Sequence, residues 1–232
     1  MLFPTPLQPA RLIRRYKRFL ADVLLPDGST ALAHCPNPGA MLGLGEPGMN
    51  IWLKPGSGKL AWGWVLTEIP DTGSLVGIDT TLPNRLVAEA LQAQAIPELT
   101  GYAEIRPEVA YGSNSRVDFR LAGPDRPPAY LEVKNVHLSR RAGLAEFPDC
   151  VTARGAKHLR ELAAEARRGN RAVMLFLVQR PDCRHFRLAE DCDPGYAAAF
   201  REARKAGIEA LCYDCSVTQQ GIALRRALPI EE

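Results

Sequence analysis

The chain lacks any apolar run that approaches the ~20 residues needed to span a bilayer. It also lacks internal repeats and low-complexity tracts, and the apolar residues 1–7 are interrupted by prolines without a preceding basic region. These absences argue against a membrane-spanning protein and against a secretory signal peptide. With 46% apolar and 24% charged residues, the 232-residue chain has the composition of a soluble globular protein, which we expect in the cytoplasm.

The chain has little excess charge, because 29 Lys and Arg are set against 26 Asp and Glu, giving a net charge of +3. Such a balance does not by itself indicate a nucleic-acid-binding protein, but clustered cations bind phosphates even when the total charge is small. Residues 11–18 are dense in positive charge and no acid precedes Asp22, which favours phosphate binding. A second cluster, within residues 154–171, fits phosphate binding and a solvated face paired with Glu161 and Glu165 about equally well.

Six cysteines are scattered along a chain that is neither small nor secretory in character, so a disulfide framework is not expected. Cys212 and Cys215 have CxxC spacing, and together with Cys183 and Cys192 they could build a zinc site. The irregular spacing of the upstream pair and the strand-like neighbourhood of the second pair instead favour cysteines that pack as small apolar residues.

Two strand-like segments, residues 116–120 and 131–134, alternate apolar and polar side chains. Asp118 lies on the polar face of the first segment, and Glu132 and Lys134 share the polar face of the second. If the two strands pair, two carboxylates and one ammonium group converge on one patch. The solvent face of an antiparallel hairpin often has the same pattern, so both interpretations stay open at this point.

The convergent patch has the side chains that metal-dependent phosphodiester hydrolysis requires. Mg²⁺ commonly binds one or two carboxylates together with water and a substrate phosphate. It lowers the pKa of bound water and offsets charge in the transition state, while a nearby lysine positions the water or stabilises the same charge. In this interpretation Asp118 and Glu132 bind Mg²⁺ or Mn²⁺, and Lys134 is the catalytic cation.

Glycine and proline divide the first 80 residues into short apolar segments, which predicts a small β-barrel. Pro-Asp-Gly at residues 26–28 predicts a hairpin turn between the first two strands. Trp52, Trp62 and Trp64 could provide a surface on which bases stack, although tryptophans in a small barrel more often belong to the core. The expected strands span residues 18–25, 29–34, 50–54, 61–67 and 74–78.

After a short linker, the pattern is typical of an α/β or α+β domain with a mixed sheet. A helix is predicted over residues 83–94, with Pro83 in its first turn, Thr81 or Asn84 as its cap, and Glu89 at the border of its apolar stripe. The other expected elements are a fully buried strand at 172–178, strands at 102–110, 115–121, 129–136, 208–213 and 221–227, and helices at 152–168 and 194–206.

A family likeness extends over essentially the whole chain. It is carried, in order, by residues 15–23, 34–37, 83–86, 115–119, 132–136, 147–155 and 157–159. On these stretches the chain resembles the sugar fermentation stimulation protein (SfsA) family. The resemblance implies an OB-like barrel over residues 1–80 and a domain similar to the PD-(D/E)xK nuclease superfamily over residues 81–232. It also implies binding to DNA without strong sequence preference.

Carried over residue by residue, the resemblance implies that Asp118 and Glu132 are the two acids of the nuclease motif and Lys134 its lysine. Glu89 would match the helix acid that is common in those nucleases. Val117 occupies the position of the superfamily's namesake proline, which is not a ligand, so its absence weakens the motif without removing the chemistry. Because fold does not fix function, two hypotheses remain: a DNA-binding protein, regulatory or DNA-processing, and an active Mg²⁺- or Mn²⁺-dependent nuclease.

The residues expected to contact DNA come from both halves of the chain. They are Arg14, Lys17, Arg18, His34 and Asn37 in the first half, and Arg154 and Lys157 in the second. His34 and Asn37 are the weaker candidates, because a polar group in a loop can also serve only to brace its own backbone. His158, one helical turn after Arg154, would reach a scissile phosphate from the side, although a lone histidine on a helix is more often a boundary residue.

Overall fold

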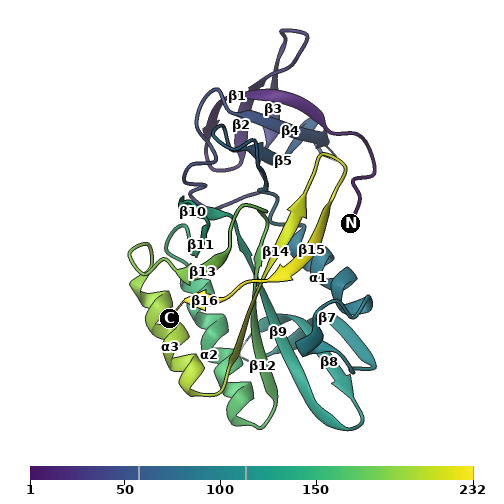
Figure 1. The fold of residues 1–232 in the computed structure, drawn as a ribbon, viewed down its shortest axis with the longest axis vertical. Coiled ribbons are helices and arrows are strands. Elements are labelled where there is room, and N and C mark those ends of the chain that lie inside the picture. Colours follow the sequence, from purple (N-terminus) through teal and green to yellow (C-terminus); the bar gives the residue numbers. More distant parts are fainter. Residues whose placement is uncertain (57, 113, 232) are drawn as a thin grey trace.

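The computed structural model describes residues 1–56, 58–112 and 114–231, which fold into a β-barrel followed by a larger α/β domain (Figure 1). Residue 232, where the expected second domain ends, lies outside the described residues. The barrel forms the purple and blue upper part of Figure 1, and the helices gather in the lower part. Within the described residues, no helix has both the length and the apolar character needed to cross a membrane.

The predicted OB-like barrel is confirmed. Its strands run in the order β3-β2-β1-β4-β5, and a parallel pairing of β3 with β5 closes the barrel, with β6 alongside β5. The hairpin predicted at residues 26–28 connects β2 and β3, which pair antiparallel. The bounds are β1 (Gln8–Tyr16), β2 (Leu20–Leu24), β3 (Thr30–His34), β4 (Asn50–Pro55), β5 (Trp62–Glu68) and β6 (Leu75–Gly77).

Strand β1 was not among the expected strands, because its arginines obscured its alternation. Ala10 and Leu12 are buried in the barrel core, whereas Arg11 and Arg14 point to solvent. Most of the cation-dense segment is therefore the outer face of a strand rather than a free basic arm. This strand is the middle member of the barrel sheet, between β2 and β4.

The tryptophans belong mainly to the barrel core. Trp64 is fully buried, and its indole N–H donates to the carbonyl oxygen of Leu66 over 3.0 Å. Trp52 is 7% exposed, and Trp62 is half-buried. A stacking surface on Trp52 and Trp64 is therefore excluded, because their ring faces are covered by other side chains.

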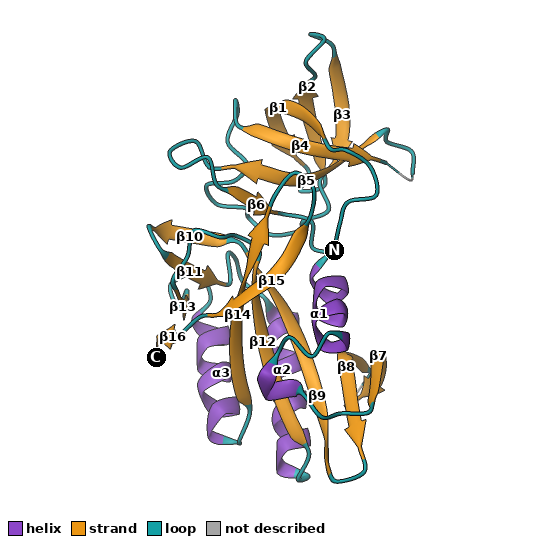
Figure 2. Cartoon of the chain, turned by 45° about the vertical axis from the view of Figure 1, so that its right-hand side comes forward, coloured by secondary structure: helices purple, strands orange, loops and turns teal. Residues whose placement is uncertain are grey.

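The second domain is the expected mixed-sheet domain with flanking helices. Its central sheet has the order β15-β14-β12-β9-β8-β7, in which β9, β12 and β14 are parallel (Figure 2). The elements are α1 (Pro83–Gln92), a 3₁₀ turn (Pro97–Leu99), β7 (Glu104–Tyr111), β8 (Ser115–Gly123), β9 (Arg126–Val136), β10 (Leu138–Arg141), β11 (Leu144–Phe147), α2 (Ala153–Arg167), β12 (Arg171–Val178), β13 (His185–Leu188), α3 (Pro194–Lys205), β14 (Glu209–Val217), β15 (Ile222–Ala227) and β16 (Ile230–Glu231).

The central sheet separates two apolar cores. Helix α1 packs on one face, together with side chains from the barrel, and helices α2 and α3 pack on the other. Strand β12 is buried along nearly its whole length, as its apolar run predicts. Cys212 and Cys215 belong to opposite cores, because residues three apart on a strand point to opposite faces. The CxxC pair therefore cannot bind one zinc ion through both thiols.

One local prediction is wrong, and one small sheet was not predicted. Helix α1 begins after Leu82 with Pro83 in its first turn, but no side chain caps it, so neither Thr81 nor Asn84 is the cap. A small sheet, β10-β11-β13-β16, was also not expected. Its strands are at most four residues long, and one carries the buried Glu146 that binds two arginines, so the local pattern is too short and too polar to predict a strand.

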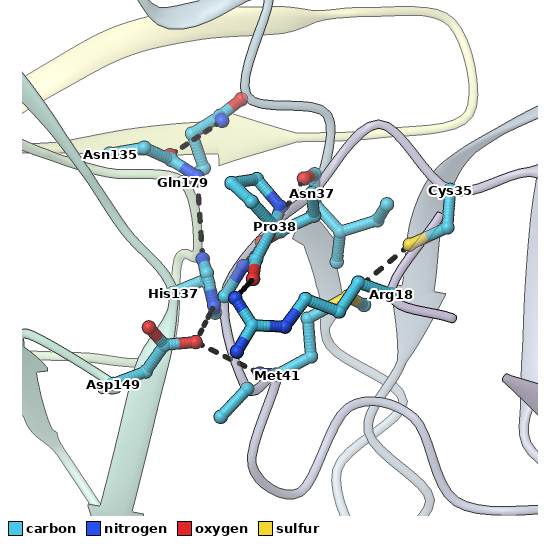
Figure 3. Close-up of polar contacts among 12 residues, drawn as sticks. Arg18, Cys35, Asn37, Pro38, Met41, Asn135, His137, Asp149 and Gln179 are labelled. Carbon is cyan, nitrogen blue, oxygen red and sulfur yellow. Dashed lines mark hydrogen bonds and ion pairs between the residues drawn. The ribbon is translucent and has the colours of Figure 1, made fainter. Parts of the chain in front are cut away.

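The barrel and the second domain are joined by buried polar contacts (Figure 3). The carboxylate of Asp149 accepts a hydrogen bond from the backbone N–H of Met41, at 2.9 Å, and lies 3.2 Å from the Nε2 atom of His137. The side-chain amide of Gln179 donates to Asn135 Oδ1 over 2.7 Å, which leaves the Asn135 amide nitrogen to donate to His137 Nδ1. His137 therefore carries its proton on Nε2 and donates it to Asp149.

We expect Asp149→Asn to lower stability by about 1–3 kcal/mol at pH 7, because the substitution removes a buried charge-assisted hydrogen bond. Burial alone would raise the pKa of Asp149, but the bonds from His137 and Met41 lower it to about 2. A depressed carboxyl pKa stabilises the fold above the unfolded-state pKa of about 4, and this stabilisation is lost as pH falls toward 2.

Thermal melts of the two proteins from pH 7 to pH 3 measure the effect. The difference in melting temperature should be largest at neutral pH and should shrink in acid. Asp125→Asn, at an exposed position, is the control and should melt like the parent at every pH. A constant difference across the pH range would contradict the assignment.

Candidate functional site

The site forms where strand β8 separates from strand β9. The two strands pair antiparallel as far as Phe119 and Leu131. Beyond that pair, the Val133 N–H of β9 donates to a side chain of β8 instead of to its backbone. The acceptor is the Oδ2 atom of Asp118, at 2.7 Å. The other oxygen, Oδ1, accepts from the amide of Asn84 on helix α1 over 2.8 Å. Asp118 is thus fixed between the sheet and the start of the helix.

Glu132 is the most deeply buried charged group of the site, at 2% exposed. Its Oε1 atom accepts the ammonium of Lys134 over 2.6 Å and also contacts Nδ1 of His158. Its Oε2 atom is buried and has no hydrogen-bond partner among the described residues. One oxygen of this carboxylate therefore accepts from both donors, and the other has no hydrogen-bond partner among the described residues.

Helix α2 supplies the remaining wall of the site. Its N-terminal residue Thr152 caps the helix by accepting the N–H of Gly155. His158, one helical turn after Arg154, is 6% exposed. Its Nε2 atom accepts a hydrogen bond from the Arg154 guanidinium, at 3.3 Å. Since Nε2 accepts, the imidazole proton is on Nδ1 and is donated to Glu132. Arg154 itself is exposed at the rim.

The two carboxylates have opposite electrostatic environments. Burial raises the pKa of Asp118, and the neighbouring charge of Glu132 raises it further. Burial would also raise the pKa of Glu132, but the hydrogen bond from His158 and the charge of Lys134 outweigh it, so this pKa lies below its ordinary value. The site therefore combines a firmly ionised glutamate with an aspartate that ionises less readily and gains from a nearby cation.

These groups line one pocket of about 270 Å³. Its walls are Thr80, Thr81, Pro83, Asn84, Asp118, Glu132, Val133, Lys134, Asn135, Arg154 and His158. A larger groove of about 950 Å³ lies beside α3 and β14, and shares none of these residues. The smaller pocket is the candidate site, because it contains Glu132, which is 2% exposed and has one carboxylate oxygen without a hydrogen-bond partner among the described residues.

The structure thus brings together four of the sequence-predicted residues, Asp118, Glu132, Lys134 and Arg154. Glu89 lies elsewhere on helix α1. Its carboxylate is 2.7 Å from the N-terminal amine of the chain, and its side chain is 52% exposed. It does not line the pocket, and we leave it out of the candidate site. The helix residue that reaches Asp118 is Asn84, five positions earlier and therefore on another face.

The predicted DNA contacts of the barrel have different surroundings. Arg14 has an acidic partner, because it forms an ion pair with Asp22 across the β1–β2 hairpin, at 2.7 Å. Lys17, Arg18 and His34 are exposed.

Asn37 is 1% exposed, and both ends of its side-chain amide bond to backbone groups, at Ile78 and Gly39. Asn37 therefore braces its loop rather than facing a ligand. On the second domain, Lys157 lies 3.7 Å from Glu161, one turn along α2.

Sequence reasoning missed the role of two residues. Asn84 was considered only as a helix cap. The alternation of β8 gives no sign that Asp118 on this strand contacts helix α1. His158 was considered for contact with phosphate, whereas its imidazole orients Glu132. The spacing of four residues between Arg154 and His158 was the available signal that their side chains are in contact, because residues i and i+4 share a helix face.

Comparisons with known proteins agree with this architecture. Residues 13–78 match the SfsA N-terminal OB domain, and residues 81–221 match the sugar fermentation stimulation protein RE domain. A sugar fermentation stimulation protein homolog from Jannaschia sp. is 59% identical over 100% of this chain and 97% of its own length. A homolog from Dinoroseobacter shibae is 57% identical over 100% of this chain and 96% of its own.

A solved structure, that of Pyrococcus furiosus SfsA in complex with Ca²⁺, is also similar. It has a TM-score of 0.90 at 29% sequence identity, and the match covers 100% of this chain and 98% of that one. Both domains are matched in the same order, and close relatives are matched over their full length. The chain therefore belongs to the sugar fermentation stimulation protein (SfsA) family.

Proposed function

We propose that this protein binds DNA with little sequence preference and hydrolyses phosphodiester bonds with the help of a divalent cation held in the pocket. The observation that carries this proposal is the unused Oε2 atom of Glu132. An unsatisfied buried polar atom costs stability, so a buried carboxylate oxygen without a hydrogen-bond partner calls for an explanation. Here both donors, Lys134 and His158, converge on Oε1, and Oε2 is left for a ligand.

The residues of the pocket fit a hard divalent cation such as Mg²⁺ or Mn²⁺. Asp118 and Glu132 would hold it, which is within the one or two carboxylates that Mg²⁺ commonly takes from a protein. A bound cation would acidify a water molecule and neutralise charge on a phosphate. The Ca²⁺ in the structure of the Pyrococcus furiosus relative supports a cation site in the family.

The other residues of the pocket have roles that follow from their contacts. Lys134 is held by Glu132 at 2.6 Å, so its ammonium has a fixed place from which to orient water or stabilise a developing negative charge. Arg154 is exposed at the rim and is fixed by His158, a position suited to a substrate phosphate. Lys and Arg recognise the backbone of a nucleic acid rather than its bases, which is the basis for weak sequence preference.

A second candidate function, DNA binding without cleavage, is favoured by one observation. Both oxygens of Asp118 already accept hydrogen bonds, from Val133 and Asn84, so this carboxylate has a structural use without any metal. The two candidates share the binding step and differ in whether the acids do chemistry.

The first prediction concerns the cation alone. Titration of the metal-free protein with Mn²⁺, followed by calorimetry or by electron paramagnetic resonance, should give one site whose affinity rises with pH. Burial and Glu132 raise the pKa of Asp118, so a proton competes with the cation for this carboxylate at lower pH. Asp118→Asn should weaken binding at least tenfold.

Glu89→Gln is the matched control, since Glu89 lies on the same domain but pairs with the chain terminus. It should bind Mn²⁺ like the parent protein. If it loses affinity instead, then Glu89 is a ligand and the two-carboxylate site is incomplete.

The second prediction concerns cleavage. In an assay with single- and double-stranded DNA and RNA, DNA should be cut in the presence of Mg²⁺ or Mn²⁺ and left intact with chelator. Lys134→Ala should reduce the rate by about 100-fold or more, because it removes a charged donor from the reacting centre. DNA affinity should change little, since binding depends mainly on cations outside the pocket.

Arg154→Ala should weaken both binding and cleavage, while Arg160→Ala, an exposed arginine two turns further on the same helix, should weaken neither. Salt-sensitive binding with no cutting of any of these substrates would instead favour the second candidate. Cleavage that survives Asp118→Asn in pure protein would contradict the site assignment.

A further inference from the structure

The hairpin between β1 and β2 exposes an aromatic ring on the barrel surface. Phe19 is 45% exposed, and it is the one aromatic residue among the large hydrophobic side chains that are exposed in the described part of the chain. Its ring stacks on that of His34, at the end of β3, with centroids 6.4 Å apart and an angle of 20° between the planes. An aromatic pair facing solvent is unlike the tryptophans of this barrel, two of which are buried.

The turn that carries Phe19 has an unusual backbone. Lys17 and Arg18 have φ values of 49° and 62°, in the left-handed region that glycine adopts without steric cost and other residues avoid. The turn is held by the Arg15 side chain, which donates to the Arg18 carbonyl oxygen over 3.0 Å, and by a bond of 2.8 Å from the Phe19 N–H to the Lys17 carbonyl. This strained turn directs two cationic side chains and one aromatic ring to the same exposed tip.

The exposed tip is adjacent to the junction with the second domain (Figure 3). The Arg18 guanidinium donates to the carbonyl oxygen of Pro38, and three residues later the Met41 N–H donates to Asp149. Asp149 begins the segment that enters helix α2 and reaches Arg154 at the rim of the pocket. The ring pair and the pocket are thus connected by a short stretch of fixed loop rather than by a mobile linker.

We propose that Phe19 and His34, with Lys17 and Arg18, form a stacking site for an unpaired base of single-stranded DNA, whose backbone continues across the junction toward the pocket. The inference rests on the proposed function and adds the class of substrate. An exposed ring beside cations is the combination that single-strand-binding surfaces use, because every base has an aromatic face and every linkage a negative charge. In a duplex the base faces are covered by their neighbours, so a duplex can use the cations but not the ring.

The test compares binding of a 20-nucleotide single strand and the matching duplex, in chelator so that neither is cut. Phe19→Ala should weaken single-strand binding about tenfold, equivalent to about 1.4 kcal/mol, and duplex binding less than twofold. Phe19→Leu should behave like Phe19→Ala, since it keeps apolar volume but has no ring. Arg18→Ala should weaken both substrates together.

Leu24→Ala is the matched control, because Leu24 is 38% exposed on the strand that follows the same turn. It should bind both substrates like the parent. A single strand that contains 2-aminopurine gives a second readout: stacking on the ring should quench its fluorescence with the parent protein and not with Phe19→Ala. All variants should keep the parent melting temperature, since the substituted side chains are exposed.

The outcomes separate the two proposals. If Phe19→Ala weakens both substrates equally or neither of them, and 2-aminopurine is not quenched, the stacking site is overturned while the proposed DNA binding stands. If the parent protein binds neither substrate at low salt, the proposed function fails, and the stacking site fails with it.

Discussion

The site is organised around the buried negative charge of Glu132. Burial alone would favour its protonated form, and the charge persists because Lys134 and His158 both donate to one of its oxygens. This arrangement has two consequences. The second oxygen is left without a hydrogen-bond partner in the described structure, and it is the atom to which the proposed cation would bind. The charge also disfavours ionisation of the adjacent Asp118, whose pKa is raised mainly by burial and further by Glu132. In the proposed function, a divalent cation between the two carboxylates would relieve that repulsion.

The end of strand β9 and the residue that follows it link this site to the barrel. Asn135 lines the pocket and accepts the side-chain amide of Gln179, whose backbone carbonyl in turn accepts the N–H of Gly77 at the end of the barrel. A Cβ atom at position 77 would lie 2.7 Å from the Gln179 side chain, so this approach requires glycine. Two residues beyond Asn135, His137 donates to Asp149, which also holds the barrel loop at Met41. Rotation of the barrel relative to the sheet would break the two bonds that cross between the domains, from Gly77 to Gln179 and from Met41 to Asp149. In the proposed function, a nucleic acid bound to the barrel would therefore be held in register with the pocket.

Much of this arrangement could be predicted from the sequence, and the failures have identifiable causes. Period-two alternation is a local property, so it correctly predicted strands β8 and β9, and Asp118, Glu132 and Lys134 line one pocket. The same alternation gives no sign that β8 and β9 are unpaired before Phe119 and after Leu131, and hence no sign that a pocket opens there. The family resemblance, and not the alternation, favoured a catalytic patch over a solvated hairpin face. Side chains whose partners come from distant elements were misassigned, because Asn84 resembles a cap locally and a helical position alone did not decide whether Glu89 reached the site.

The net charge of the chain is small, but positive charge is concentrated at particular places on its surface. Many arginines form ion pairs within the protein. Arg140 and Arg187 pair with Glu146, and Arg14 pairs with Asp22. Such pairs contribute little field at the surface. The exposed cations at the β1–β2 turn and at the rim of the pocket act differently, because charges separated by more than about 8 Å are largely screened from one another at physiological salt. Acids on the far side of the molecule therefore do not cancel the attraction of these cations for a phosphate. A net charge of +3 is consequently compatible with a DNA-binding surface, provided that the surface is compact and continuous with the junction between the domains.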